Sequence, residues 1–161
     1  IDGYQNFTPL KVDLATYRSQ MSMLFGTREL HGMFFPYPVI HKADSGFALD
    51  NDFVSREIAK DESSCGQMLV SPNWDPDWVA LEVNRLGLRG LKPFAIYASV
   101  ENPWEAELPD FLPPSLAAVA NREHWSVTIH LMRRGLDDPS NIYWIRNYCE
   151  TYPGMILILD H

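Results

Sequence analysis

Two short apolar runs, each ending in a histidine, decide the fold: Ser126-Val-Thr-Ile-His130 and Met155-Ile-Leu-Ile-Leu-Asp-His161. Each run is too short for a typical helix, is rich in β-branched or aliphatic residues, and is bounded by turn or loop residues. These features indicate a strand that is buried on both faces. Parallel sheets expose side chains to a shared cleft at the carboxyl ends of their strands. The two histidines are therefore predicted to face one site.

The spacing of these histidines fits a repeating unit of one strand and one helix. His130 and His161 are 31 residues apart. An α/β barrel of about 250 residues divided into eight units has units of nearly this length. Two imidazoles at the ends of neighbouring strands suggest a metal site or an acid/base site.

Strand and helix signals alternate along the rest of the chain. Apolar runs predict further strands at 32–36, 67–70 and 88–93. Asp75-Pro76 and Asp138-Pro139 each combine an acidic N-cap with proline at the first helical position, which predicts two helix starts. Alternation without hairpin signals is typical of a parallel sheet with right-handed crossovers.

Two more helices are predicted from caps and apolar spacing. One begins after Asp13 and ends at Gly26, and its apolar positions fall on one face: Leu14, Tyr17, Met21, Leu24 and Phe25. The other covers 50–58, is capped by Asp50 and turns three apolar side chains inward: Phe53, Val54 and Ile58.

The fold class that follows is α/β, a parallel (β/α)8 TIM-barrel type of which the chain covers about the first six strands. A closed eight-stranded barrel needs about 250 residues, and the chain has 161. We therefore expect a partial barrel, and a complete open sheet is the alternative. No linker or repeat divides the sequence, so residues 1–161 are predicted to form a single domain.

Composition and charge narrow the range of partners. The chain is 46% hydrophobic and 21% charged, which is ordinary for a globular domain, and its net charge is −8. An acidic chain is a poor partner for nucleic acid or an anionic membrane surface. No apolar run approaches the roughly 18 residues that span a bilayer. Cys65 and Cys149 match no metal or redox spacing, which favours reduced, buried thiols in a cytoplasmic protein.

An ordered set of short motifs over residues 45–161 resembles the amidohydrolase superfamily. The pattern is most similar to the amidohydrolase-related branch of lactonases, other hydrolases and non-oxidative decarboxylases. The motifs are Asp50-Asn51-Asp52-Phe53-Val54, Ser71-Pro72 with Asp75-Pro76, Gly87-Leu-Arg-Gly90-Leu-Lys92, Ile129-His130, Tyr152-Pro153 and Ile158-Leu-Asp-His161. The Asp-His ending is similar to the lactonase side of the branch.

The resemblance implies roles for three residues of a metal-dependent barrel. His130 occupies the fifth-strand position of a metal ligand, and His161 occupies the sixth-strand position that binds metal or transfers a proton. Lys92 matches the fourth-strand position, where a lysine with a depressed pKa can bind an anionic substrate. A lysine whose stem only snorkels from the barrel end is the structural alternative. The implied cofactor is a divalent metal ion, with Zn²⁺ as the first candidate. Such an ion would activate a bound water.

The first-strand positions depart from the family pattern. The family opens with a His-x-His pair, and the equivalent positions in this chain hold Tyr4 and Asn6. Three functions follow as expectations. The first is a metal-dependent hydrolase acting on an ester, lactone or amide bond of a small carboxylated substrate. The alternatives are a metal-dependent non-oxidative decarboxylase and a non-catalytic barrel without its metal. The expected partner is a small molecule, and a homo-oligomer is possible.

Overall fold

The computed structural model describes residues 12–37, 44–132 and 135–160. For residues 44–46 it describes the backbone only. The chain divides into two compact units, Ile1–His31 and Gly32–His161. Tyr4, Asn6 and His161 lie outside the described residues. No described helix is long and apolar enough to cross a membrane.

The first unit contributes one described helix, α1 (Leu14–Phe25). Asp13 caps it as predicted, because its side chain accepts a hydrogen bond from the Thr16 amide at 2.8 Å. Gly26 follows the helix with a φ of 66°, a conformation that favours glycine. The apolar face expected on this helix is not buried as a whole. Only Leu14 is buried, and Leu24 and Phe25 are exposed.

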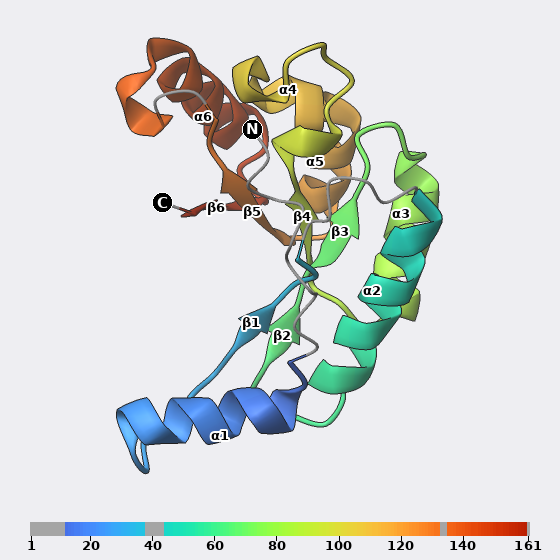
Figure 1. The fold of residues 1–161 in the computed structure, drawn as a ribbon. Helices are drawn as coiled ribbons and strands as arrows, with labels where there is room; N and C mark the ends of the chain where they lie inside the picture. Colours follow the sequence, from blue (N-terminus) through green and yellow to red (C-terminus); the bar gives the residue numbers. More distant parts are fainter. Residues whose placement is uncertain (1–11, 38–43, 133–134, 161) are drawn as a thin grey trace. The chain divides into compact units, whose positions relative to one another are not determined.

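The second unit is a parallel α/β arrangement, which confirms the predicted fold class (Figure 1). Its strands are β1 (Met33–Phe34), β2 (Cys65–Gly66), β3 (Met68–Val70), β4 (Gly90–Pro93), β5 (Ser126–His130) and β6 (Ile156–Asp160). β1 pairs with β2, and the order of the larger sheet is β3-β4-β5-β6, with every pair parallel. Among the described residues β6 pairs only with β5, so the sheet is open at that edge.

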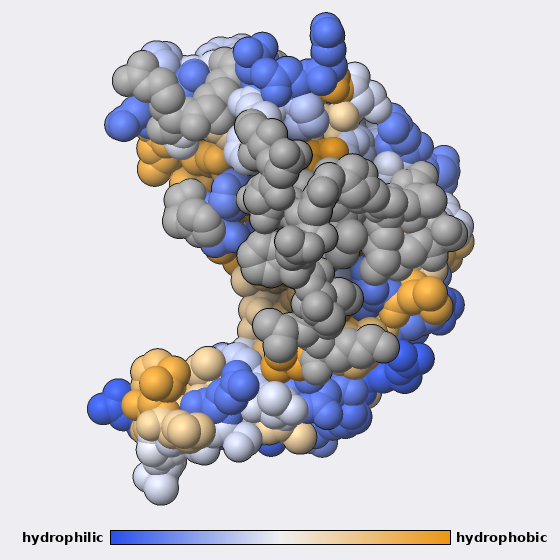
Figure 2. All heavy atoms as spheres, in the orientation of Figure 1, coloured by the Kyte–Doolittle hydropathy of each residue, from blue (hydrophilic) through white to orange (hydrophobic). Residues whose placement is uncertain are grey.

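Helices and short 3₁₀ turns connect these strands in the predicted order. They are α2 (Asp44–Ile58), α3 (Pro76–Arg85), η1 (Ala95–Tyr97), η2 (Pro103–Glu105), α4 (Leu108–Phe111), α5 (Pro114–Arg122), η3 (Gly135–Asp137) and α6 (Pro139–Thr151). The predicted caps of α3 and α6 are confirmed, because Asp75 accepts from the Trp78 amide and Asp138 from the Ser140 amide, both at 2.9 Å. Hydrophilic residues cover much of the outer surface of α2 and α3, at the right of Figure 2.

Sequence-based details of one strand, one helix and the two cysteines are wrong. β6 is not buried on both faces as predicted, because Ile156 and Leu159 are exposed. The helix expected over 50–58 begins at Asp44, so Asp50 lies inside it and is not its cap. Val54 and Ile58 are buried as expected, but Phe53 is only half-buried. Cys149 is exposed and Cys65 is half-buried, so neither thiol is fully buried, although both are free.

The helix-facing side of the sheet forms the main core. Alternate strand residues pack there with α3 and α5, and include Met68, Leu91, Val127 and Ile129, all 0% exposed. Because side chains alternate along a strand, the residues between them point to the opposite face. That opposite face carries the polar residues of the sheet.

One side chain of α2 forms two hydrogen bonds with the backbone of β3. Asn51, itself buried, donates from Nδ2 to the Leu69 carbonyl at 3.0 Å. Its Oδ1 accepts from the Leu69 amide at 2.8 Å. Phe47, one turn earlier on α2, belongs to a second apolar cluster with Leu69 and Phe94.

Candidate active site at the carboxyl ends of the strands

The polar face of the sheet is built in rows across neighbouring strands. In the middle row, Leu69 is in register with Lys92, and Thr128 is in register with Ile158. The pairing of Leu91 with Val127 brings Lys92 and Thr128 to neighbouring positions of β4 and β5. His130 and Asp160, which are in register with each other, lie one row nearer the carboxyl ends.

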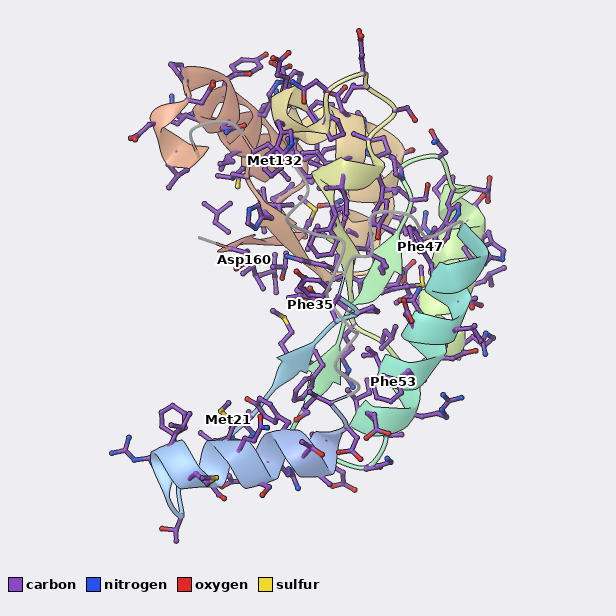
Figure 3. The ribbon with its side chains drawn as sticks, viewed as in Figure 1. Met21, Phe35, Phe47, Phe53, Met132 and Asp160 are labelled. Carbon is purple, nitrogen blue, oxygen red and sulfur yellow. The ribbon has the colours of Figure 1, made fainter. Side chains whose placement is uncertain are left out.

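Lys92 is the centre of this face. Its side chain is 0% exposed, and its Nζ lies 3.1 Å from Oδ2 of Asp160. The same nitrogen lies 4.6 Å from the centre of the Phe35 ring and 4.8 Å from that of Phe94. Phe35 and Asp160 are labelled in Figure 3. Two aromatic faces and one carboxylate therefore surround the ammonium group, an arrangement that favours its charged form.

Burial has the opposite effect on this ammonium group. Removing it from water lowers the pKa of Lys92 below its ordinary value of 10.5, because the charged form loses its hydration. The hydrogen bond that Lys92 donates to Asp160 and the negative charge of Asp160 raise the pKa, but by less. Lys92 is therefore a buried cation whose charge depends on its anionic partner.

The predicted site residues come together in part. Lys92 contacts Asp160, and Asp160 is the register partner of His130, so these three residues occupy the same end and face of the sheet. Lys92 and His130, the two of these that the sequence singles out, thus lie on one face, while their roles stay predictions. His161 follows Asp160 in the chain but lies outside the described residues. Its predicted part in proton transfer stays a prediction.

The described residues do not by themselves complete a metal centre. His130 offers an imidazole nitrogen and Asp160 a carboxylate, both suitable donors for a divalent ion. Over 12–37, 44–132 and 135–160, however, no group of three or more histidine, cysteine, aspartate or glutamate side chains is placed to hold a metal. A catalytic ion needs about three protein ligands. A further ligand would have to come from outside the described residues.

Sequence reasoning missed Asp160, Phe35 and Phe94. The signal for Asp160 was present, because side chains two positions apart on a strand lie on the same face, so Asp160 shares the face of Ile158. Phe35 and Phe94 follow β1 and β4 in the sequence, and Phe94 is buried. Aromatic residues at strand ends fit a packed core equally well, so nothing in their type indicated contact with a lysine.

A second polar row lies across the same face, two residues nearer the amino ends of the strands than Lys92. The Nε2 of Gln67 donates to Oγ of Ser126 at 2.9 Å, and Gly90 lies between them in the register. A Cβ at Gly90 would lie 2.2 Å from the Ser126 carbonyl oxygen, so only glycine fits. Gln67 Oε1 and Thr128 Oγ1 are buried and have no hydrogen-bond partner in the described part of the chain.

A depression of about 620 Å³ lies elsewhere, lined by Val100, Glu101, Asn102 and Glu105. It includes none of the residues around Lys92. Its acidic lining is that of a solvated loop, so the strand ends remain the candidate site.

Comparison with known proteins supports the barrel type. No protein-family model and no curated protein matches the sequence. Two solved structures are similar in fold, each at 16% identity: 2,6-dihydroxybenzoate decarboxylase from Rhizobium and 5-carboxyvanillate decarboxylase from Novosphingobium aromaticivorans. The second is a complex with manganese and 4-hydroxy-3-methoxy-5-nitrobenzoic acid.

The extent of the match is large for this chain and partial for the others. The Rhizobium structure aligns with a TM-score of 0.60 over 92% of this chain and 56% of its own, and the Novosphingobium structure with 0.57 over 88% and 48%. The chain thus spans about half the length of these proteins. At this identity the likeness is one of fold, and it supports the partial barrel predicted from the sequence.

Proposed function

We propose that this chain forms part of a metal-dependent decarboxylase that acts on a small aromatic carboxylic acid. The observation that carries the proposal is the surroundings of Lys92. A fully buried ammonium between two phenylalanine rings, beside a carboxylate, has the chemistry to bind an aromatic anion. The two similar folds, both decarboxylases of substituted benzoates, favour this reaction over hydrolysis.

Each predicted site residue has a role in this proposal. Lys92 binds the carboxylate or another anionic oxygen of the substrate, and Phe35 and Phe94 form the apolar walls beside it. His130 is a ligand of the divalent ion, and manganese replaces zinc as the first candidate because of the Novosphingobium complex. When bound, such an ion would supply Lewis acidity to a substrate oxygen.

The reaction requires a proton at the carbon that loses the carboxylate. The bond between the ring and the carboxylate breaks, its electron pair remains on the ring carbon, a proton takes the vacated position, and CO₂ leaves. His161 is the proposed proton donor, because an imidazole changes its charge near neutral pH. The substrate carboxylate loses its negative charge when CO₂ leaves, and an apolar site without water would favour that loss.

The hydrolase expected from the sequence is the second candidate. It rests on the Asp160-His161 ending, which resembles the lactonase side of the branch. The small-molecule partner, cytoplasmic location and possible homo-oligomer also stay predictions.

The test combines metal analysis with product detection. We expect the purified protein to contain a stoichiometric divalent metal that is lost in His130→Ala, and to release CO₂ from hydroxybenzoates but no acid from lactones. Lys92→Met is expected to lower kcat/KM for the aromatic acid by at least about 100-fold. Lys60→Met, at a lysine that is 59% exposed and pairs with Glu57, is the matched control.

Each outcome assigns one function. Acid release from lactones without CO₂ would establish the hydrolase instead. A folded protein that binds no metal and turns over neither substrate class would contradict both reactions and favour the non-catalytic barrel.

A further inference from the structure

The two members of the buried ion pair differ in their access to water. The Lys92 side chain is 0% exposed, whereas the Asp160 side chain is 34% exposed. The carboxylate can exchange its contact with Lys92 for contact with water at little cost. The ammonium cannot, because no solvent reaches it. Lys92 can therefore keep its charge after losing Asp160 only if another anion takes its place.

The position of Asp160 determines the order in which a ligand meets the pair. Asp160 lies one row nearer the carboxyl ends of the strands than Lys92, because Thr128 is the register partner of Ile158 and Asp160 follows Ile158 by two residues. Ligands of parallel barrels enter from that end. An incoming anion therefore reaches Asp160 before it reaches Lys92.

The charges allow only one carboxylate close to Lys92. Phe35 and Phe94 offer ring faces to Nζ and carry no charge. A second carboxylate at Nζ would lie beside Asp160, and two like charges in a poorly hydrated site repel each other strongly. The substrate carboxylate and the Asp160 carboxylate thus require the same place.

We propose that Asp160 is a specificity-determining residue that competes with the carboxylate of the substrate for the ammonium group of Lys92. In the free protein Asp160 is the counter-ion of Lys92, and an anionic ligand binds by displacing it. Neutral analogues of the ligand have nothing to offer Lys92 in exchange, so they leave the ion pair in place and their binding does not depend on the charge of Asp160. This inference rests on the proposed carboxylate substrate, but it requires no turnover.

The experiment measures binding to Asp160→Asn, which keeps the shape of the side chain and removes its charge. Titration calorimetry with benzoate and with benzamide compares wild type, Asp160→Asn, Lys92→Met and the double variant. All four proteins are titrated at the same mildly acidic pH. We expect Asp160→Asn to bind benzoate at least about fivefold more tightly, the lower end of typical coupling between sites. Its affinity for benzamide should not change.

Lys92→Met is expected to abolish the gain, so the double variant should bind benzoate no better than Lys92→Met alone. Asp160→Ser serves if Asp160→Asn fails to fold, as judged by near-ultraviolet circular dichroism. Unchanged or weaker benzoate binding in both folded Asp160 variants, or a gain that persists without Lys92, overturns the inference. Tighter benzoate binding without CO₂ release would uphold the inference while the proposed function fails. CO₂ release without tighter binding would do the reverse.

Discussion

His130 and Asp160 are partners in the register of β5 and β6, at the carboxyl end of both strands. Paired residues of parallel strands point to the same face, so an imidazole and a carboxylate lie on one face there, and the carboxylate also contacts Lys92. A substitution at Asp160 thus changes the surroundings of a cation and of an imidazole together. Variants of Lys92 and Asp160 are informative when they are compared as a pair.

The stability of the two single variants should differ. Asp160→Ala leaves the buried ammonium without this counter-ion and should lower the free energy of unfolding by about 1–3 kcal/mol. Lys92→Met replaces the ammonium by an apolar side chain of similar length, while the exposed part of Asp160 keeps its water. It should remain within about 1 kcal/mol of wild type. Urea unfolding measures both, and a larger loss in Lys92→Met than in Asp160→Ala would contradict this interpretation.

The lowered pKa of Lys92 makes stability depend on pH in a defined direction. Between the folded pKa and the unfolded value of 10.5, the unfolded state binds more protons than the folded state. The free energy of unfolding contributed by this group therefore rises with pH across that window. Lys92→Met should remove the rise, so the difference between wild type and variant isolates it.

The titration of Tyr148 changes the free energy of unfolding in the opposite direction at alkaline pH. The pH dependence of wild type must therefore be compared with that of Lys92→Met. Burial raises the pKa of Tyr148 above its ordinary value of 10.0, so the folded state holds this proton longer than the unfolded state. Its contribution to stability falls as pH increases above 10.0. A wild-type curve parallel to that of Lys92→Met throughout the alkaline range would show that Lys92 keeps an ordinary pKa.

Thr128→Val tests whether the hydroxyl beside Lys92 is satisfied. Thr128 Oγ1 is buried without a hydrogen-bond partner among the described residues. Replacing an unsatisfied hydroxyl by a methyl group should leave stability unchanged or raise it by up to about 1 kcal/mol. Thermal unfolding measures the sign. A clear loss of stability would reveal an ordered water or a partner from another part of the protein.

Gly90→Ala should damage the sheet far more than the same change at another glycine. The new Cβ would lie 2.2 Å from the Ser126 carbonyl oxygen, so β4 and β5 would have to separate. We expect a loss of about 3 kcal/mol or more. Gly87→Ala is the control, since its φ of 65° adds strain but its Cβ meets nothing within 4 Å, and it should cost about 1 kcal/mol. Similar losses in the two variants would contradict the close packing at Gly90.

The strands and caps were predictable because their signals are local. The apolar runs that end at His130 and His161 contain β5 and β6, and the Asp-Pro pairs became the starts of α3 and α6. Local signals failed where packing decides. The apolar residues of α1 repeat with helical spacing, yet spacing alone cannot state whether a partner surface covers them.

The candidate site was predictable only for residues with a distinctive chemistry. His130 was identified because a histidine at the end of an apolar strand requires explanation, and Lys92 because it matches the fourth-strand position of the family that the sequence resembles. The contact between Lys92 and Asp160 joins residues 68 positions apart, and it depends on a register that only the assembled sheet defines. Phenylalanine is common in any protein core, so the residue type of Phe35 and Phe94 did not indicate a contact with Lys92.

Asn51 gives Leu69 the two hydrogen bonds that a neighbouring strand would otherwise supply, and so its side chain imitates a peptide group. Leu69 is the register partner of Lys92, which means that α2 is anchored at the depth of the buried cation. Sliding the helix along the sheet would break both bonds at once. The anchor thereby keeps Phe47 against Leu69 and Phe94, so a helix outside the sheet sets the dimensions of the aromatic wall beside the lysine.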